Sequence, residues 1–331
     1  MTHPASTSRS SRGWTAAWVA LTALVALAVW KLAPHFPELV RTLGGGHPGW
    51  LVAAVLLNFV GQPLQALAWT HFVPPGVTYR RRAFFQTSGV MAAVSNGVPV
   101  LLSGLATGVQ LLATRGGLGH AGALAVVSLD QLSEGVAKVA LVALVLAVAP
   151  VPGEMALATG GLAVGVVAMA AVLWFAAGKR PAPPGPEEDA PPAGGWPATA
   201  LAFVGRWARS LERLRSPRRM LAGLALVLTI KVGEGAAIFA VVHALGVDAP
   251  FWGVPLALLA VNLSTMVGVT PANLGVYEGA AFGAWTLAGV DAPMALAVAL
   301  AQHAAYLIAA LGGGWLLTTL AAGSEGPAAG S

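Results

Sequence analysis

The chain has 331 residues, of which 56% are hydrophobic and 9% are charged, with a net charge of +5. Soluble domains carry about 25% charged residues, so this composition excludes an ordinary soluble protein and indicates an integral membrane protein. The absence of cysteine excludes disulfides and thiolate metal sites, and the seven histidines show no metal-ligand spacing. We expect no cofactor, and no ATP-binding motif is present. The basic residues lie between or at the ends of apolar runs, where they set orientation rather than bind nucleic acid.

The first predicted elements are a polar tail, residues 1–13, and an apolar helix from Trp14 to about Ala33. This run reaches the ~20 residues that cross a bilayer. Because more spans follow, we interpret it as an uncleaved first helix rather than a signal peptide. The later apolar segments are residues 49–72, 83–97, 100–114, 119–149, 154–177, 217–246, 252–269, 274–289 and 293–322, followed by a tail at residues 323–331.

Two pairs of these segments are short, and a Pro/Gly break joins each pair, "SNGVPVLLSG" (95–104) and "GVTPANLG" (268–275). We expect the units at about 83–114 and 252–289 to be re-entrant hairpins, which are tolerated at membrane depth only where protein or a water-filled cavity covers the backbone. The predicted fold is therefore an all-α, polytopic membrane helix bundle with two broken units.

The distribution of arginine and lysine sets the predicted orientation, with both termini in the cytoplasm. The residues on that side would be Arg9, Arg12, Arg80, Arg81, Arg82, Arg115, Lys179, Arg180 and the arginines of residues 206–219. Six full spans with two re-entrant units satisfy this rule, and so do ten crossing segments, which leaves both topologies open.

A Pro/Gly-rich charged stretch, residues 178–198, separates two membrane halves, residues 14–177 and 217–322. After it, Phe203, Trp207 and Leu211 recur at helical spacing with arginines off their stripe. Residues 178–216 are thus predicted to be a cytoplasmic linker and a basic amphipathic helix. The helix is either a simple anchor or a site for anionic lipid.

The two broken units also match each other at an ungapped offset of 172 residues, which places Val98-Pro99 on Thr270-Pro271 and Gly117 on Gly289. Both copies have the order short segment, break, short segment, loop, long span. Three full spans between the breaks would invert the second copy, as in transporters built from inverted repeats. Chance similarity among apolar helices is the alternative.

Ionisable side chains within spans cost ~2.5–3.5 kcal/mol each on insertion scales, so they are functional candidates. They are Asp130, Glu134, Lys138, Lys231, Glu234, Glu278 and His303. The first three share one helix face, because they are spaced i, i+4, i+8. These three residues either line a polar path for a lipid headgroup, or Glu134 and Lys138 form an ion pair that fixes helix packing. Lys231 can likewise form an ion pair with Glu234, three residues later.

Glu278 follows Pro271 and Gly275 in the first turn of a short helix, where an acidic side chain is favoured. It either caps that helix, with Tyr277 packing nearby, or meets a cationic headgroup, a proton or Lys231 beside a helix N-terminus that faces a lipid phosphate, and we favour a combination of the two roles. Hydrogen bonds from Asn262 add to this region. For His303 we expect packing or hydrogen bonding, with a proton relay as the alternative. The amides of Asn58, Gln62 and Gln65 are expected to join helices.

The stretch "TPANLGVYEGAAFGAWTLAGVDAPMALAVALAQHAAYLIAALGGGWLL" (270–317) resembles the signature of the lysylphosphatidylglycerol synthase transmembrane-domain family, also called flippase-like proteins. The residues that match its T/P-G-G-x-G-x-x-E block are Pro271, Gly275, Tyr277 and Glu278. Ala272 and Asn273 replace the two glycines, and His303, beside Gln302, stands where the family usually has arginine.

The first broken unit resembles the family's N-x-x-x-P-x-x-x-G-E-x-x-R block through Asn96, Pro99 and Gly104. Leu105 and Gly108 occupy positions comparable to its acidic and basic residues. The following stretch, "VVSLDQLSEGVAK" (126–138), resembles the family's next helix, in which acidic residues recur. The resemblance is thus specific in the second unit and degraded in the first.

The resemblance implies a stand-alone lipid-handling membrane domain rather than a lysyltransferase. We therefore expect a non-enzymatic, flippase-like protein of the bacterial inner membrane that moves or binds a phospholipid or a polyprenyl-linked lipid. An oligomer or a separate lipid-synthesising partner is compatible with this role. One alternative is a membrane enzyme that modifies a headgroup through Asp130 and Glu134, and another is a scaffold or regulatory subunit acting through the arginine-rich helix.

Overall fold

The computed structural model describes residues 44–97, 103–150, 153–177, 195–211, 216–266 and 270–322. All regular elements within these residues are helical, which confirms the predicted all-α class. They are α3 (Pro48–Phe72), α4 (Arg81–Gly97), α5 (Ser103–Thr114), α6 (Gly119–Val148), α7 (Gly153–Ala177), α8 (Gly195–Ser210), α9 (Pro217–Ala244), α10 (Gly253–Ser264), η3 (Pro271–Asn273), α11 (Val276–Leu287) and α12 (Ala292–Ala322). The predicted first helix, most of the linker and the C-terminal tail lie outside the described residues.

Four of the described helices, α3, α6, α9 and α12, are long and apolar enough to cross a membrane. On α7 the apolar stretch found is the shorter Ala163–Ala176. The helices α5, α10 and α11 have 12 residues each. A helix of that length is about 18 Å long, against a hydrocarbon core of ~30 Å, so none of the three can cross the bilayer alone.

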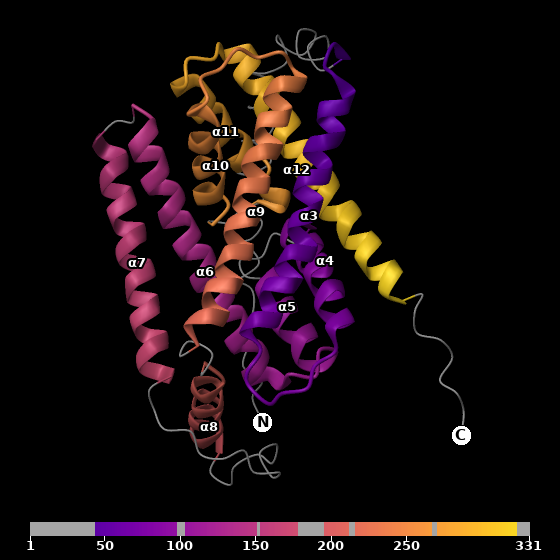
Figure 1. The fold of residues 1–331 in the computed structure, drawn as a ribbon, viewed down its shortest axis with the longest axis vertical. Coiled ribbons are helices and arrows are strands. Elements are labelled where there is room, and N and C mark those ends of the chain that lie inside the picture. The colour runs from indigo at the N-terminus through magenta and orange to yellow at the C-terminus, as the bar shows by residue number, and fades with distance from the viewer. Residues whose placement is uncertain are drawn as a thin grey trace, which may run out of the picture.

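The short helices occupy opposite halves of the bundle (Figure 1). The pair α4 and α5 lies in the half that also holds α8, and the pair α10 and α11 lies in the other half. The short element η3, within the second break, contacts α4, the helix that leads into the first break. The two interrupted segments therefore approach each other inside the bundle.

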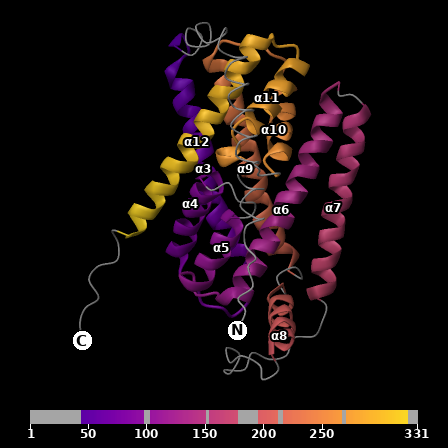
Figure 2. The same ribbon diagram turned by 180° about the vertical axis from the view of Figure 1, so that it is seen from behind.

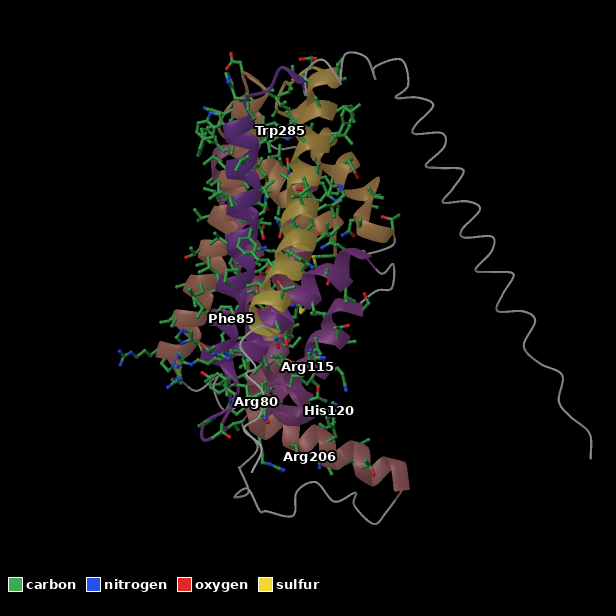
Figure 3. The ribbon with its side chains drawn as sticks, turned by 90° about the vertical axis from the view of Figure 1, so that its right-hand side faces the viewer. Arg80, Phe85, Arg115, His120, Arg206 and Trp285 are labelled. Carbon is green, nitrogen blue, oxygen red and sulfur yellow. The ribbon has the colours of Figure 1, made fainter. Side chains whose placement is uncertain are left out.

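The long helices frame these pairs. Helices α3 and α9 pack along each other in opposite directions, and α12 crosses α3 and α4 on one side (Figure 1). On the other side α6 contacts α7, α9 and α10, and the view from behind shows the same arrangement (Figure 2). Arg80, Arg115 and Arg206 lie at one end of the molecule and Trp285 at the other (Figure 3). The three labelled arginines thus lie together at the end of the molecule that carries α8.

Two apolar cores hold the bundle together. In the half with α8, the side chains of Trp69, Phe72 and Phe84 are fully buried and pack with residues of α5 and α6. In the other half, Trp285 is fully buried among residues of α9, α10, α11 and α12. The outward side chain of Phe175 is 75% exposed, as expected for a surface in contact with lipid.

The amphipathic helix begins earlier than the sequence analysis predicted. Helix α8 starts at Gly195, inside the predicted linker at 178–198, and includes Pro197. Proline is tolerated in the first turn because the backbone N–H groups there have no intrahelical partner. The predicted apolar stripe packs on the bundle, since Trp207 Nε1 donates to Ser128 Oγ on α6 at 3.3 Å and Leu211 is fully buried.

Helices α4 and α12 touch through glycine. A Cβ atom built on Gly314 would lie 2.6 Å from the carbonyl oxygen of Gly89, whereas one built on Gly312, two residues earlier, meets no atom within 4 Å. Small residues allow this close approach of two backbones within a membrane.

We expect Gly314→Val to lower stability by about 1–3 kcal/mol, because the added side chain must push α4 away from α12. Gly312→Val introduces the same residue into the same helix without a clash and serves as the control. Thermal unfolding of the detergent-solubilised variants measures the difference. Equal shifts for the two variants would mean that the helix contact does not limit stability.

Candidate functional site

Lys231 lies at the centre of a charged cluster that joins three helices. Its Nζ atom is 3.0 Å from Glu234 Oε1 on α9 and 3.1 Å from Glu134 Oε2 on α6. It also donates to Asn262 Oδ1 on α10 at 3.1 Å, and Asn262 Nδ2 donates to Glu234 Oε2 at 3.3 Å. One ammonium group thus connects α6, α9 and α10.

Lys138 extends the cluster along α6. Its Nζ atom is 3.7 Å from Glu134 Oε2, longer than the ~2.7–2.9 Å of a strong charge-assisted hydrogen bond. The side chains of Lys138, Glu134, Lys231 and Glu234 are 15%, 14%, 11% and 26% exposed, respectively. Two ammonium groups face two carboxylates, so the cost of burying each charge is reduced by its partners.

Amide side chains from α3 complete the polar layer. Gln65 Nε2 donates to Asp130 Oδ1 on α6, and Asp130 is 2% exposed. Gln62 Nε2 donates to the carbonyl oxygen of Ala309 on α12 at 2.9 Å. These contacts confirm the expectation that Gln62 and Gln65 join helices, whereas Asn58 Nδ2 donates to its own helix at Ala54.

A stack of rings lies between α11 and α12. The ring centroids of Tyr277 and His303 are 4.2 Å apart with an interplanar angle of 10°, and Tyr306 stacks on Tyr277 at 5.9 Å. Gln302 Nε2 donates to the Tyr277 hydroxyl at 2.9 Å. Asn96 Nδ2, on α4, donates to the Tyr306 hydroxyl at 3.3 Å. The stack thereby links the first broken unit to the last helix.

The second break has left-handed backbone. Ala272 and Asn273 have φ values of 54° and 55°, and Gly275 has a φ of 81°. Ala272 and Asn273 stand where the family block named above has two glycines, and glycine adopts this conformation without a steric penalty. Asparagine tolerates it, but alanine does so at a cost.

Glu278 closes the start of α11. Its Oε2 accepts a hydrogen bond from the backbone N–H of Gly275 at 2.7 Å, and its Oε1 is 2.8 Å from His303 Nδ1. The structure thus places Glu278 with His303 and the helix cap rather than in the cluster around Lys231. A capping carboxylate satisfies one of the free backbone donors of a helix N-terminus.

Two adjoining cavities lie within the bundle. The α4-side cavity, of about 280 Å³, is lined by residues of α3, α4, α6, α9 and α12, and the α10-side cavity, of about 210 Å³, adds residues of α10 and α11. The residues that line both are Asn58, Glu134, Lys138, Glu234 and Tyr306. The two cavities therefore form one polar space around the charged cluster.

The structure brings most of the predicted site residues to this space. Those that line one or both cavities are Asn96, Asp130, Glu134, Lys138, Lys231, Glu234, Asn262, Tyr277 and Gln302. The described lining does not include Pro271, Asn273, Gly275, Glu278 or His303. These five shape the break and the ring stack beside the α10-side cavity.

Sequence reasoning missed Tyr306 and Trp69, which also line the α4-side cavity. A usable signal existed for Tyr306, because a phenol in the middle of a long apolar run lies far from the membrane interface, where tyrosine is usually found. The ion pair between Lys231 and Glu134 had no sequence signal, since its partners come from different helices.

The polar space is suited to hold a charged group. It offers ammonium donors, carboxylate acceptors, amides and two phenols along two adjoining cavities, and Lys138, which lines both, is only loosely paired. Among the described residues no group of three histidine, aspartate or glutamate side chains is placed to hold a metal ion.

We expect Lys231→Met to destabilise the protein by about 3–5 kcal/mol, because it leaves two buried carboxylates without their common cation. Combining Lys231→Met with Glu234→Gln should recover part of this loss, since Glu134 then keeps Lys138 as its partner. Chemical or thermal unfolding measures both, with Glu234→Gln alone as the control. An equal loss of stability in the single and double variants would show that the unpaired Glu234 carboxylate is not the cause of the destabilisation.

Ala272→Gly should raise stability by about 1 kcal/mol, because glycine removes the penalty of the left-handed conformation. The matched control is Ala304→Gly at an exposed site within α12, where glycine should instead cost about 1 kcal/mol. Thermal unfolding tests this, because the unfolding temperature should rise for Ala272→Gly and fall for Ala304→Gly. A loss of stability in both would show that Ala272 is not strained.

Comparison with known proteins supplies the family. The family model described as the lysylphosphatidylglycerol synthase TM region matches residues 14–314. No curated protein and no solved structure gives a significant match. Because the match covers most of the chain and agrees with the membrane-spanning helices, the protein is an integral membrane protein of the lysylphosphatidylglycerol synthase transmembrane-region family.

Proposed function

We propose that this protein is a non-enzymatic lipid transporter that admits the headgroup of a membrane lipid into the polar space and carries it between the two leaflets. The observation that supports this most directly is the charged cluster beside two cavities among membrane-spanning helices. Charged groups within a membrane are costly and are typical of pathways for polar substrates. A purely structural bundle would be no less stable with apolar side chains there.

The arrangement of the short helices supports the same proposal. We propose that α4–α5 and α10–α11 are re-entrant units that enter from opposite faces, because each pair lies in its own half of the bundle (Figure 1). The helices α3 to α6 and α9 to α12 then form an inverted repeat of the order long, short, short, long. Transporters with such repeats carry their site near the midplane, between the copies.

We further propose a bacterial inner membrane as the location, with the end that carries α8 in the cytoplasm. Arg80, Arg115 and Arg206 gather at that end (Figure 3). Cytoplasmic loops carry the excess of arginine and lysine in membrane proteins. Headgroups would then pass from the cytoplasmic leaflet through the α4-side cavity to the α10-side cavity.

A direct test uses purified protein in vesicles that contain fluorescent phospholipids with different headgroups. We expect wild-type protein to speed exchange between leaflets, and Lys138→Gln to slow it at least tenfold while unfolding at a similar temperature. Lys138 is chosen because it lines both cavities but is only loosely paired.

The control is Arg218→Gln, which removes the same charge at an exposed position at the start of α9, away from the cavities. Exchange that is no faster than in protein-free vesicles, for all headgroups, would refute the proposed function. Equal slowing by Lys138→Gln and Arg218→Gln would remove the cavity from the mechanism.

A further inference from the structure

An apolar groove, distinct from the two polar cavities, lies on the outer surface between α6, α9 and α10. This apolar groove has a volume of about 670 Å³. Buried side chains such as Leu141 and Leu258 form its floor. Its edges are exposed apolar side chains, with Val232 at 72% and Phe251 at 76% exposure.

The groove borders the charged cluster. Lys231 and Leu258 line both the apolar groove and the α10-side cavity. The lining of this continuous surface therefore changes from apolar to charged side chains at Lys231. A molecule that fits both parts must have an apolar chain attached directly to a polar group.

We infer that the apolar groove holds one acyl chain of a glycerophospholipid whose headgroup lies in the α10-side cavity. This inference rests on the proposed function and names the class of lipid and its position. The lipid is bound from the side, with its polar end at Lys231 and its chain against α6, α9 and α10.

The length of the groove fits one acyl chain. Its lining on α9 extends from Leu228 to Phe239. From Lys231, where the headgroup would lie, to Phe239 is about 12 Å at ~1.5 Å rise per residue, most of the ~15 Å that the acyl chains of one leaflet fill in a ~30 Å hydrocarbon core. A long polyprenyl chain would extend well past Phe239.

The chemistry of the membrane favours this occupant over another helix. Apolar surface gives no hydrophobic driving force for helix association in a bilayer, because lipid tails are equally apolar. A partner helix in the apolar groove would also leave the polar end at Lys231 unused. A phospholipid gains contacts with the charged cluster while its chain remains in an apolar environment.

The direction of the groove indicates which leaflet the lipid comes from. Lys231 lies in the middle of α9 and Phe239 lies nearer its C-terminal end. Helix α9 runs from the half that holds α8 toward the half that holds α10 and α11 (Figure 1). A bound chain thus points away from the α8 end. A phospholipid of the leaflet on the α8 side has this orientation and reaches the site when its headgroup is raised to the middle of the membrane.

One glycine keeps the floor of the groove open. A Cβ atom built on Gly235 would lie 3.7 Å from Leu258 Cδ2, an ordinary contact, so a larger side chain fits the helix and extends into the groove. A Cβ atom on Gly165 of α7 meets nothing within 4 Å. Gly235→Leu therefore fills the groove, and Gly165→Leu is its matched control on another exposed face.

The test uses the full chain in phosphatidylethanolamine nanodiscs that contain phosphatidylethanolamine with a photoreactive diazirine either near the carbonyl or near the methyl end of one acyl chain. We expect the carbonyl-end probe to label peptides around Lys231 and Leu258, and the methyl-end probe to label those around Phe239 and Phe251. Gly235→Leu should reduce both at least fivefold, and Gly165→Leu should leave them within twofold of wild type.

A photoreactive amino acid in place of Val232 provides a readout that does not depend on Gly235→Leu folding. An adduct of phospholipid mass supports the inference. A crosslink to residues 14–33 of the same chain, or to a second copy, overturns it, as does labelling in the reverse order or unchanged labelling in folded Gly235→Leu. Groove labelling without lipid exchange would refute only the proposed function, whereas exchange that depends on Lys138 without groove labelling would refute only this inference.

Discussion

The interaction on which the rest of the structure depends is the bridge from Lys231 to Glu134 and Glu234. A lysine in an apolar helix requires a partner, and here one partner lies on another helix, with Asn262 on a third. These contacts fix how α9 faces α6 and α10. Once that orientation is set, the polar faces of the helices enclose the two cavities, and the apolar cores fill the halves on either side.

The second break places polar groups next to this bridge. Because α10 ends at Ser264, well short of a full span, the chain can turn inside the bundle and start α11 beside α12. The turn needs left-handed residues at Ala272, Asn273 and Gly275. Glu278 then stabilises the new helix start and holds His303. The interrupted helix thus brings Tyr277 to the α10-side cavity, where Gln302 of α12 donates to its hydroxyl.

The meeting of this polar space with the apolar groove gives the protein an amphiphilic site. The change in character occurs at Lys231, whose long side chain has apolar methylenes and a charged end. Under the proposed function, a site of this kind would accept a lipid from the side without removing its chain from the membrane. Under the proposed function the two tasks are separate, because the cavities would hold the headgroup and the outer helix faces would hold the chain.

The sequence by itself determined the membrane class, most of the described helices, the two interruptions and the list of ionisable side chains. It did so because helix length, apolar composition and Pro/Gly breaks are local properties. The pairs Glu134–Lys138 and Lys231–Glu234 were predictable for the same reason, since their partners are one turn apart. Only the tertiary structure decided that Lys231 also binds Glu134, that Glu278 meets His303, and that Tyr306 lines the cavities. Those contacts join separate helices, and the angle and rotation at which helices pack are set by all their side chains together.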